Sequence, residues 1–318
     1  MFKALLLLLL AAFPIASVLA QAYPVKPIRF VVPYPPGGGT DLVGRTISTK
    51  ISETLGQQVI VENRPGAQGN VGTSSALKSP PDGYTVVLSY VGTVAMNPFL
   101  YKNIGYDPLK DFSHISLATV QPYVVVVNPV VPVKNLKELA VLAKSQPGRL
   151  TFASSAAAGQ LAGEYFKMLT KTNMLHIPFK GAGPAAINVM GGHVDLMFAT
   201  PAGSVPQVKA GKLRALAVTA STRLSALPNV LTSKESGFPE FEISGWYGVA
   251  APVNTPKDIV TRLNTEIVNA LKSSDVRDRL INSGLEVKSN SPEEMTDFAR
   301  TEYDRWGKVI KAAGIKPE

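Results

Sequence analysis

Short β-branched runs alternate with amphipathic stretches along most of this 318-residue chain, and this alternation limits the possible folds more than any other feature. The runs occupy residues 28–33, 59–62, 84–90, 115–120, 123–128, 150–154, 175–179, 194–199 and 213–219. Helical patterns lie between them at residues 41–55, 136–145, 160–170 and 184–190. Such alternation is typical of mainly parallel sheets with helices on both faces. The sequence therefore predicts an α/β fold.

The final third of the chain changes character after residues 246–252 and reads as helices with clear start signals. Thr255 precedes Pro256, a pattern that predicts a capping hydroxyl ahead of a proline at the first helical position. Ser291 and Glu294 have the spacing of a capping box at the start of a helix over residues 292–313. The expected core stripe of that helix consists of Met295, Phe298, Trp306, Val309 and Ile310.

A rough similarity between the two halves of the sequence indicates two lobes. Each half opens with a strand that runs into small residues and then a helix, at residues 30–41 and at residues 151–160. We predict a first lobe formed by residues 23–122 and 248–318, and a second lobe formed by residues 123–247. The chain then crosses between the lobes twice, and two crossings form a natural hinge.

The N-terminus has the pattern of a secretory signal peptide. Lys3 precedes an apolar run over residues 4–13, and small residues follow at 16–22, so cleavage after Ala20 and cleavage after Ala22 both fit. We assign residues 1–22 to the signal. The run is short for a membrane span, and no later stretch has the length of one. The chain has no cysteine, which excludes disulfides, thiol chemistry and a lipid-anchored N-terminus. A freely diffusing, soluble periplasmic protein is expected.

The formal charge of +9 becomes about +8 (9 − 1) when the signal with Lys3 is removed. The lysines and arginines are scattered singly without interleaved aromatic residues, so a nucleic-acid partner is not expected. A basic surface with mild attraction for anions fits this pattern better.

The most informative motif joins the first strand to the first helix. Three successive glycines allow close backbone approach to a ligand, and the helix N-terminus favours an anion. The competing interpretation is a flexible turn. A nucleotide loop is not supported, because no lysine followed by Ser or Thr comes after the last glycine. The candidate ligand-binding residues of this loop are Tyr34, Pro36, Gly37, Gly38, Gly39, Thr40 and Asp41.

The second half has a similar junction of small and hydroxyl-bearing residues, which is otherwise read as an ordinary loop. Its candidate ligand-binding residues are Ser154, Ser155, Ala158, Gly159 and Gln160. Lys180, Gly181 and Ala182 open the next helix, although a lone lysine is usually only solvated. Ser89, Gly92 and Thr93 follow the third strand and complete the predicted set.

Catalytic and metal-binding signals are sparse. His114, His176 and His193 have no partner at metal-ligand spacing, and no nucleophile elbow occurs. No pair of carboxyl groups is suited to proton transfer. We therefore expect no metal, no cofactor and no enzymatic activity.

A set of motifs through nearly the whole mature chain resembles one family. It comprises Pro27-Ile28-Arg29, Val32-Pro33-Tyr34-Pro35-Pro36-Gly37-Gly38-Gly39-Thr40-Asp41, Val61-Glu62-Asn63-Arg64-Pro65-Gly66-Ala67, Pro81-Asp82-Gly83-Tyr84-Thr85, Asn97-Pro98, Tyr106-Asp107-Pro108, Leu161-Ala162-Gly163-Glu164, Phe179-Lys180-Gly181-Ala182-Gly183-Pro184-Ala185, Gly191-Gly192, Val194-Asp195, Trp246 and Ala251-Pro252. In this order the motifs resemble the tripartite tricarboxylate transporter substrate-binding proteins, or Bug receptors.

The resemblance implies a two-lobed, type II-like periplasmic binding protein, a Venus flytrap that holds a small carboxylate between its lobes. In such proteins, backbone groups and ordered waters hold the carboxylate, and the closed complex is passed to membrane transporter subunits. The chain departs from the family before Leu161, where its loop is shorter and lacks the usual serine and histidine. A sensor for a signalling partner and an exported enzyme remain alternatives. The sequence leaves the carboxylate open, and a monomer is expected because no long apolar seam is visible.

Overall fold

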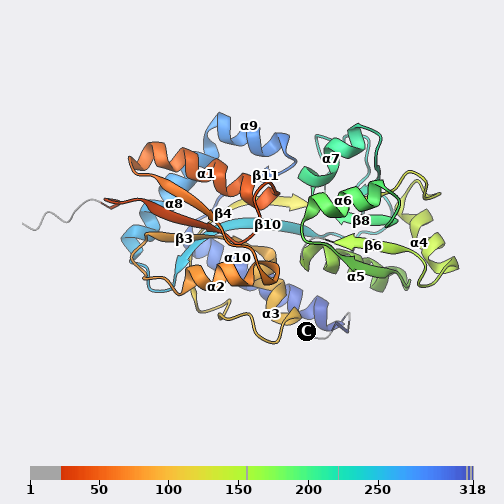
Figure 1. Ribbon diagram of the computed structural model, residues 1–318, viewed down its shortest axis with the longest axis horizontal. Coiled ribbons are helices and arrows are strands. Elements are labelled where there is room, and N and C mark those ends of the chain that lie inside the picture. Colours follow the sequence, from red (N-terminus) through yellow and green to blue (C-terminus); the bar gives the residue numbers. More distant parts are fainter. Residues whose placement is uncertain (1–22, 155–156, 221, 313, 316, 318) are drawn as a thin grey trace, which may run out of the picture.

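The computed structural model describes residues 23–154, 157–220, 222–312, 314–315 and 317. The predicted signal peptide, residues 1–22, and the candidate Ser155 lie outside this part of the chain. Within it, the strands form two sheets, and Figure 1 shows them side by side along the long axis of the molecule. The predicted two-lobed α/β fold is confirmed.

The first sheet has the strand order β11-β4-β10-β3-β1-β2. Its strands are β1 (Ile28–Val32), β2 (Val59–Asn63), β3 (Thr85–Tyr90), β4 (Phe112–Pro122), β10 (Ser244–Pro252) and β11 (Glu286–Val287). The second sheet has the order β7-β6-β8-β5-β9. Its strands are β5 (Val124–Val127), β6 (Thr151–Ser154), β7 (Leu175–Pro178), β8 (Leu196–Ala199) and β9 (Arg214–Val218).

Helices cover both sheets. The first lobe carries α1 (Gly39–Leu55), α2 (Asn70–Leu77), α3 (Asn97–Leu100), α8 (Lys257–Lys272), α9 (Ser274–Asn282) and α10 (Pro292–Ala312), with short helices at Ala67–Gly69 and Gly92–Met96. The second lobe carries α4 (Leu136–Ser145), α5 (Ala157–Thr170), α6 (Ala182–Met190) and α7 (Pro201–Lys209). In Figure 1, α1 and α9 lie along the same side of the molecule as α6 and α7, and α2 and α5 lie along the opposite side.

Of the two start signals predicted in the final third of the chain, one is confirmed and one is wrong. Ser291 and Glu294 form the predicted capping box, because each backbone N–H donates to the other residue's side chain, at 2.8 and 3.1 Å. The predicted cap at Thr255 is wrong. Helix α8 begins one residue later than expected, with Pro256 as its N-cap, and the Thr255 hydroxyl donates to the Pro252 carbonyl instead at 2.7 Å.

Both sheets are mixed rather than mainly parallel, which corrects the sequence prediction. Strand β10 lies between β3 and β4 and is antiparallel to both, and β5 is antiparallel to its two neighbours β8 and β9. The sequence pattern missed β10 because its glycines and alanines have low strand propensity. Gly248 is required there, since a Cβ at this position would lie 2.9 Å from the Ser116 carbonyl oxygen.

The chain leaves the first sheet after Pro122 and returns to it at Ser244, and one buried threonine joins the two crossings. The Thr219 hydroxyl accepts a hydrogen bond from the Tyr123 N–H at 2.8 Å and donates to the Ile243 carbonyl at 2.5 Å. Thr219 is completely buried. The lobe division at residues 122/123 and 247/248 stays a prediction, and the start of β10 at Ser244 favours a second crossing a few residues earlier.

Candidate functional site

A cleft of about 830 Å³ lies between the two lobes. The loop after β1 and the first turn of α1 line one side, and the starts of α6 and α7 line the other. The cleft therefore lies at the carboxyl ends of β1, β7 and β8, where open α/β sheets bind ligands. Its lining residues are Tyr34 to Thr40, Leu42, Tyr90, Lys180 to Pro184, Ala186, Ile187, Met190, Thr200 to Gly203, Val205 to Gln207, Tyr247, Asn282 and Ser283.

The glycine loop presents open backbone to this cleft. A Cβ added at Gly37 or Gly38 would meet no other atom within 4 Å, so the space in front of both residues is free. Gly37 has a φ of 86°, a conformation that L side chains rarely adopt. Gly38 is the N-cap of α1 and has no side-chain cap. The N–H groups of the first helical turn have no partner within the helix, so the loop offers donors and a partial positive charge to the cleft.

Asp41, a predicted ligand contact, does not line the cleft. Its carboxylate accepts hydrogen bonds from the Gly37 N–H at 3.0 Å, the Arg45 Nε at 2.9 Å and the Asn63 Nδ2 at 2.9 Å. Burial alone would raise the pKa of Asp41, but these hydrogen bonds hold it below the ordinary value. Asp41 thus shapes the glycine loop, and its charge is offset by Arg45.

Asn63, which sequence analysis did not single out, supports the same loop from β2. Its Nδ2 donates to the Tyr34 carbonyl at 3.0 Å as well as to Asp41. Its Oδ1 accepts from Arg45 at 2.9 Å. Tertiary structure brings Asn63 to the glycine loop, because β2 runs parallel to β1 and Asn63 pairs with Val32, the last residue before that loop. Its place within the motif of residues 61–67 was the signal that could have identified it.

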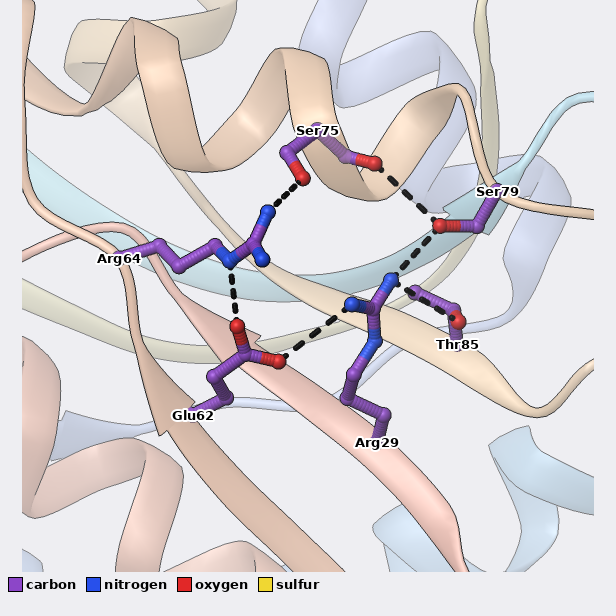
Figure 2. A network of polar contacts seen from close by, with 6 residues as sticks. All are labelled: Arg29, Glu62, Arg64, Ser75, Ser79 and Thr85. Atoms are coloured by element: carbon purple, nitrogen blue, oxygen red, sulfur yellow. Dashed lines mark hydrogen bonds and ion pairs between the residues drawn. The ribbon is translucent and has the colours of Figure 1, made fainter.

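A polar network holds the neighbouring backbone. Figure 2 shows Glu62 between Arg29 and Arg64, with Arg64 reaching Ser75 of α2. Arg29 also donates to Ser79 Oγ at 2.8 Å, so β1, β2 and the end of α2 are tied together. Such partly exposed ion pairs contribute about 0–1 kcal/mol each. The network therefore adds little to the free energy of unfolding. Its main effect is to hold the backbone of β2 in place, including Asn63 between Glu62 and Arg64.

Tyrosine rings form the floor of the cleft on the first lobe. Tyr34 and Tyr90 meet edge to face with ring centroids 5.7 Å apart, and Tyr90 stacks on Tyr247 at 5.4 Å. The Tyr34 hydroxyl donates to the Gln68 carbonyl at 2.9 Å, and the Tyr90 hydroxyl pairs with that of Tyr123 at 3.3 Å. The Tyr247 hydroxyl instead accepts from Thr40 Oγ1 of the glycine loop at 3.5 Å. Burial raises the pKa of Tyr34, Tyr90 and Tyr247 above the ordinary value. Tyr90 and Tyr247 were not predicted as site residues.

On the second lobe, Lys180, Gly181 and Ala182 line the cleft, in the positions that the sequence suggested. Gly181 is the N-cap of α6 and has a φ of 121°. The start of α7, with Thr200 as N-cap and Pro201 at the first position, was missed because its prolines and glycine obscure the helical pattern. Neither helix has a side-chain cap.

The remaining predicted residues within the described part of the chain do not line the cleft. Ser154 is buried, and its Oγ lies 2.7 Å from His176 Nε2. Ala158 is buried in α5, a Cβ at Gly159 would lie 3.2 Å from the Phe198 carbonyl oxygen, and Gln160 is only partly exposed. Ser89, Gly92 and Thr93 are buried in the first lobe, where Thr93 donates to the Tyr90 carbonyl at 3.1 Å.

The described residues contain neither a metal-binding cluster nor a helix suited to crossing a membrane. No group of three His, Cys, Asp or Glu side chains in this part of the chain could hold a metal ion. Within the same residues, no helix combines the length and apolar character that a membrane crossing requires.

Comparisons with known proteins agree with this geometry. A family model described as the tripartite tricarboxylate transporter family receptor matches residues 43–315. BugT of Bordetella pertussis is 36% identical over 304 residues, which cover 95% of this chain and 93% of BugT. The structure of R. palustris Rpa4515 with adipate is 35% identical with a TM-score of 0.89, covering 93% of this chain and 100% of that one. MatC from Rhodopseudomonas palustris with bound malate is 33% identical with a TM-score of 0.85, covering 91% of this chain and 100% of MatC. The chain therefore belongs to the tripartite tricarboxylate transporter receptor family.

Proposed function

We propose that this protein is a periplasmic receptor that captures a small carboxylate between its lobes and passes it to a tripartite tricarboxylate-type membrane transporter. The adipate and malate of the two solved relatives are small carboxylates, which supports this ligand class. The predicted signal peptide and the periplasmic binding proteins among the relatives support the location. We propose that the receptor acts as a monomer.

The observation that carries the proposal is the uncapped N-terminus of α1 at the cleft. Gly37 and Gly38 leave its backbone donors open to a ligand, and the helix end carries a partial positive charge. No Asp or Glu is among the described residues that line the cleft, and Lys180 is the one lysine or arginine there. An anion at this position meets backbone donors, and the Asp41 carboxylate behind the loop is paired with the Gly37 N–H, Arg45 and Asn63.

Closure of the lobes requires contacts that only the closed state makes with the ligand. We assign the first-lobe contacts to the residues from Gly37 to Thr40, and the second-lobe contacts to Lys180, Gly181 and the start of α7. Asp41 and Asn63 act as positioning residues that hold the glycine loop. The two crossings joined by Thr219 supply the hinge.

We propose that the ligand leaves unchanged. Proton transfer needs a group whose pKa lies near the working pH. The lining tyrosines have pKa values raised by burial, and no carboxyl or imidazole group lines the cleft within the described residues. The lining supports binding better than catalysis.

The test is a thermal-shift panel of small carboxylates on mature protein that has been purified under denaturing conditions and refolded. A ligand at a hundredfold excess over its Kd stabilises the native state by roughly 2.7 kcal/mol. A rise in Tm for carboxylates, with intact ligand recovered after incubation, is the expected result. A folded protein that responds to no carboxylate, or a ligand recovered in altered form, would contradict the proposal.

A further inference from the structure

The two lobes touch each other directly at Gly284, in the turn between α9 and β11 of the first lobe. A Cβ added there would lie 2.3 Å from the Cβ of Pro201, the first residue of α7 in the second lobe. The Pro201 Cβ is fixed to its backbone, so no side-chain rotation can relieve this overlap. One lobe would have to move by roughly 1–2 Å, because non-bonded carbon atoms pack about 3.5–4.0 Å apart.

This contact lies beside the hinge. Two residues beyond the turn, Glu286 pairs with Val120 in β4. Two residues before α7, Ala199 pairs with Val124 in β5. The chain crosses from β4 to β5 between these two pairs. A small separation at the contact therefore becomes a larger one at parts of the lobes that lie farther from the hinge.

The contact also lies on the cleft side of the hinge. Pro201, Asn282 at the end of α9 and Ser283 in the turn all line the cleft. Figure 1 shows α9 and α7 next to each other at the boundary between the lobes. Closing the cleft presses the turn against α7, whereas opening the cleft separates them.

Local structure also requires a glycine at this position, so two causes have to be separated. The Gly284 N–H donates to the Ile281 carbonyl at 2.8 Å and the Leu285 N–H donates to the Leu280 carbonyl at 3.1 Å, which is a Schellman motif with Gly284 at a φ of 77°. Gly56 ends α1 with a φ of 65°, and a Cβ there would meet no atom within 4 Å. Both glycines meet a conformational need, but Gly284 also faces the other lobe.

We infer that Gly284 and Pro201 form a closure stop, which limits how far the lobes close and thereby selects the length of the bound carboxylate. The ligand contacts are assigned to the glycine loop on one lobe and to the start of α7 on the other, so the stop sets the separation of these two walls. The selection of length rests on the proposed function. Gly284 is a positioning residue in this arrangement, because it acts on the ligand through α7.

Gly284→Ala inserts one Cβ at the closure stop, and Gly56→Ala is the matched control. The probes are malate and the longer adipate, which two solved relatives bind. In calorimetric titration, Gly284→Ala should weaken malate by about 5-fold to 150-fold, the range that overpacking of a close contact produces. Adipate should lose less affinity, so the ratio of the two dissociation constants shifts toward the longer ligand. Gly56→Ala should leave both dissociation constants unchanged.

Urea unfolding should show a similar loss of stability in Gly284→Ala and Gly56→Ala, since each places alanine at a positive φ. Gly284→Asn and Gly56→Asn repeat the comparison with a residue that tolerates positive φ better than alanine. This second pair keeps the test usable if the alanine variants fold poorly.

A distance measurement reports closure itself. The chain has no cysteine, so spin labels attach only at Ile60→Cys in the first lobe and Val141→Cys in the second. Both positions are exposed, at 51% and 67%. The shortest populated distance, measured with and without ligand, should be greater in Gly284→Ala than in wild type or Gly56→Ala.

The outcomes separate the closure stop from the proposed function. Equal label distances in Gly284→Ala and Gly56→Ala would overturn the stop, whether or not malate or adipate binds. Equal weakening of malate and adipate, with the label distance increased, would overturn the selection of length. A thermal-shift panel in which no carboxylate stabilises the wild type would contradict the proposed function, and an increased label distance in ligand-free Gly284→Ala would then still support the stop.

Discussion

Replacing Gly38 with Asp, and in parallel with Asn, tests the anion position directly. Gly38 is the N-cap of α1 with φ −92° and ψ 176°, an extended conformation that any residue adopts. A Cβ there meets nothing within 4 Å, so the new side chain enters the space of the cleft without a clash. Asp and Asn are nearly the same size and both cap helices well. The pair therefore differs in charge alone.

The expected magnitudes differ for folding and for binding. Exchanging glycine for a better N-cap residue changes the free energy of unfolding by only about a few tenths of a kcal/mol, so both variants should fold. Two carboxylates roughly 5 Å apart repel by about 3 kcal/mol at an effective dielectric constant of 20, and by about 1 kcal/mol in a fully solvated cleft. Gly38→Asp should therefore bind a carboxylate about 5-fold to 150-fold more weakly than Gly38→Asn.

The assay is calorimetric titration with the carboxylate that the thermal-shift panel selects, at low and at high salt. The loss in Gly38→Asp relative to Gly38→Asn should shrink as salt rises, because screening weakens the repulsion. Urea unfolding of both variants checks that the fold is retained. Equal affinity of the two variants at low salt would refute the assignment of the glycine loop as the anion site.

Three further predictions address the hinge, the loop support and the response to pH. Thr219→Val should lower the free energy of unfolding by about 1–3 kcal/mol for each buried backbone group left without its partner, whereas Thr219→Ser should retain most of the stability; equal urea midpoints for the two variants would contradict this. Asn63→Ala should weaken carboxylate binding by about tenfold, or about 1.4 kcal/mol, since the glycine loop loses two supporting hydrogen bonds; an unchanged Kd by calorimetry would show that the loop holds its shape without Asn63. Burial lowers the pKa of His114 from 6.5 to about 4, so between these pH values the unfolded chain binds more protons than the folded one. The free energy of unfolding should therefore fall as pH decreases from 6.5 to 4, by on the order of 3 kcal/mol in total. His114→Phe should show a shallower decline in urea unfolding between pH 7 and pH 4, and the same slope as wild type would count against the buried neutral histidine.

Much of the local structure followed from the sequence, because it depends on neighbours along the chain. The helix predicted at residues 136–145 is observed as α4 (Leu136–Ser145), with Asn135 as its cap accepting from the Glu138 N–H at 2.9 Å. The capping box at Ser291 and the buried strand β5 were predictable for the same reason. The glycine loop was recognisable because a strand, three glycines and a helix N-terminus occur in immediate succession.

Tertiary structure decided the features that depend on distant segments. Strand β10 exists because β3 and β4 supply partners on both sides, although its own residues have weak strand propensity. The same pairing brings Tyr247 beside Tyr90 and the glycine loop.

Ser154 and Asp41 show the limit of reading side chains from sequence alone. Each lies at a strand-to-helix junction suited to ligand contact, yet each has partners within the protein, His176 for Ser154 and Arg45 with Asn63 for Asp41. The sequence by itself determined where a backbone could bind an anion, because backbone geometry is set by local order. Only the tertiary structure decided which side chains remain free to line the cleft, because a polar group's partners come from segments far apart in the chain.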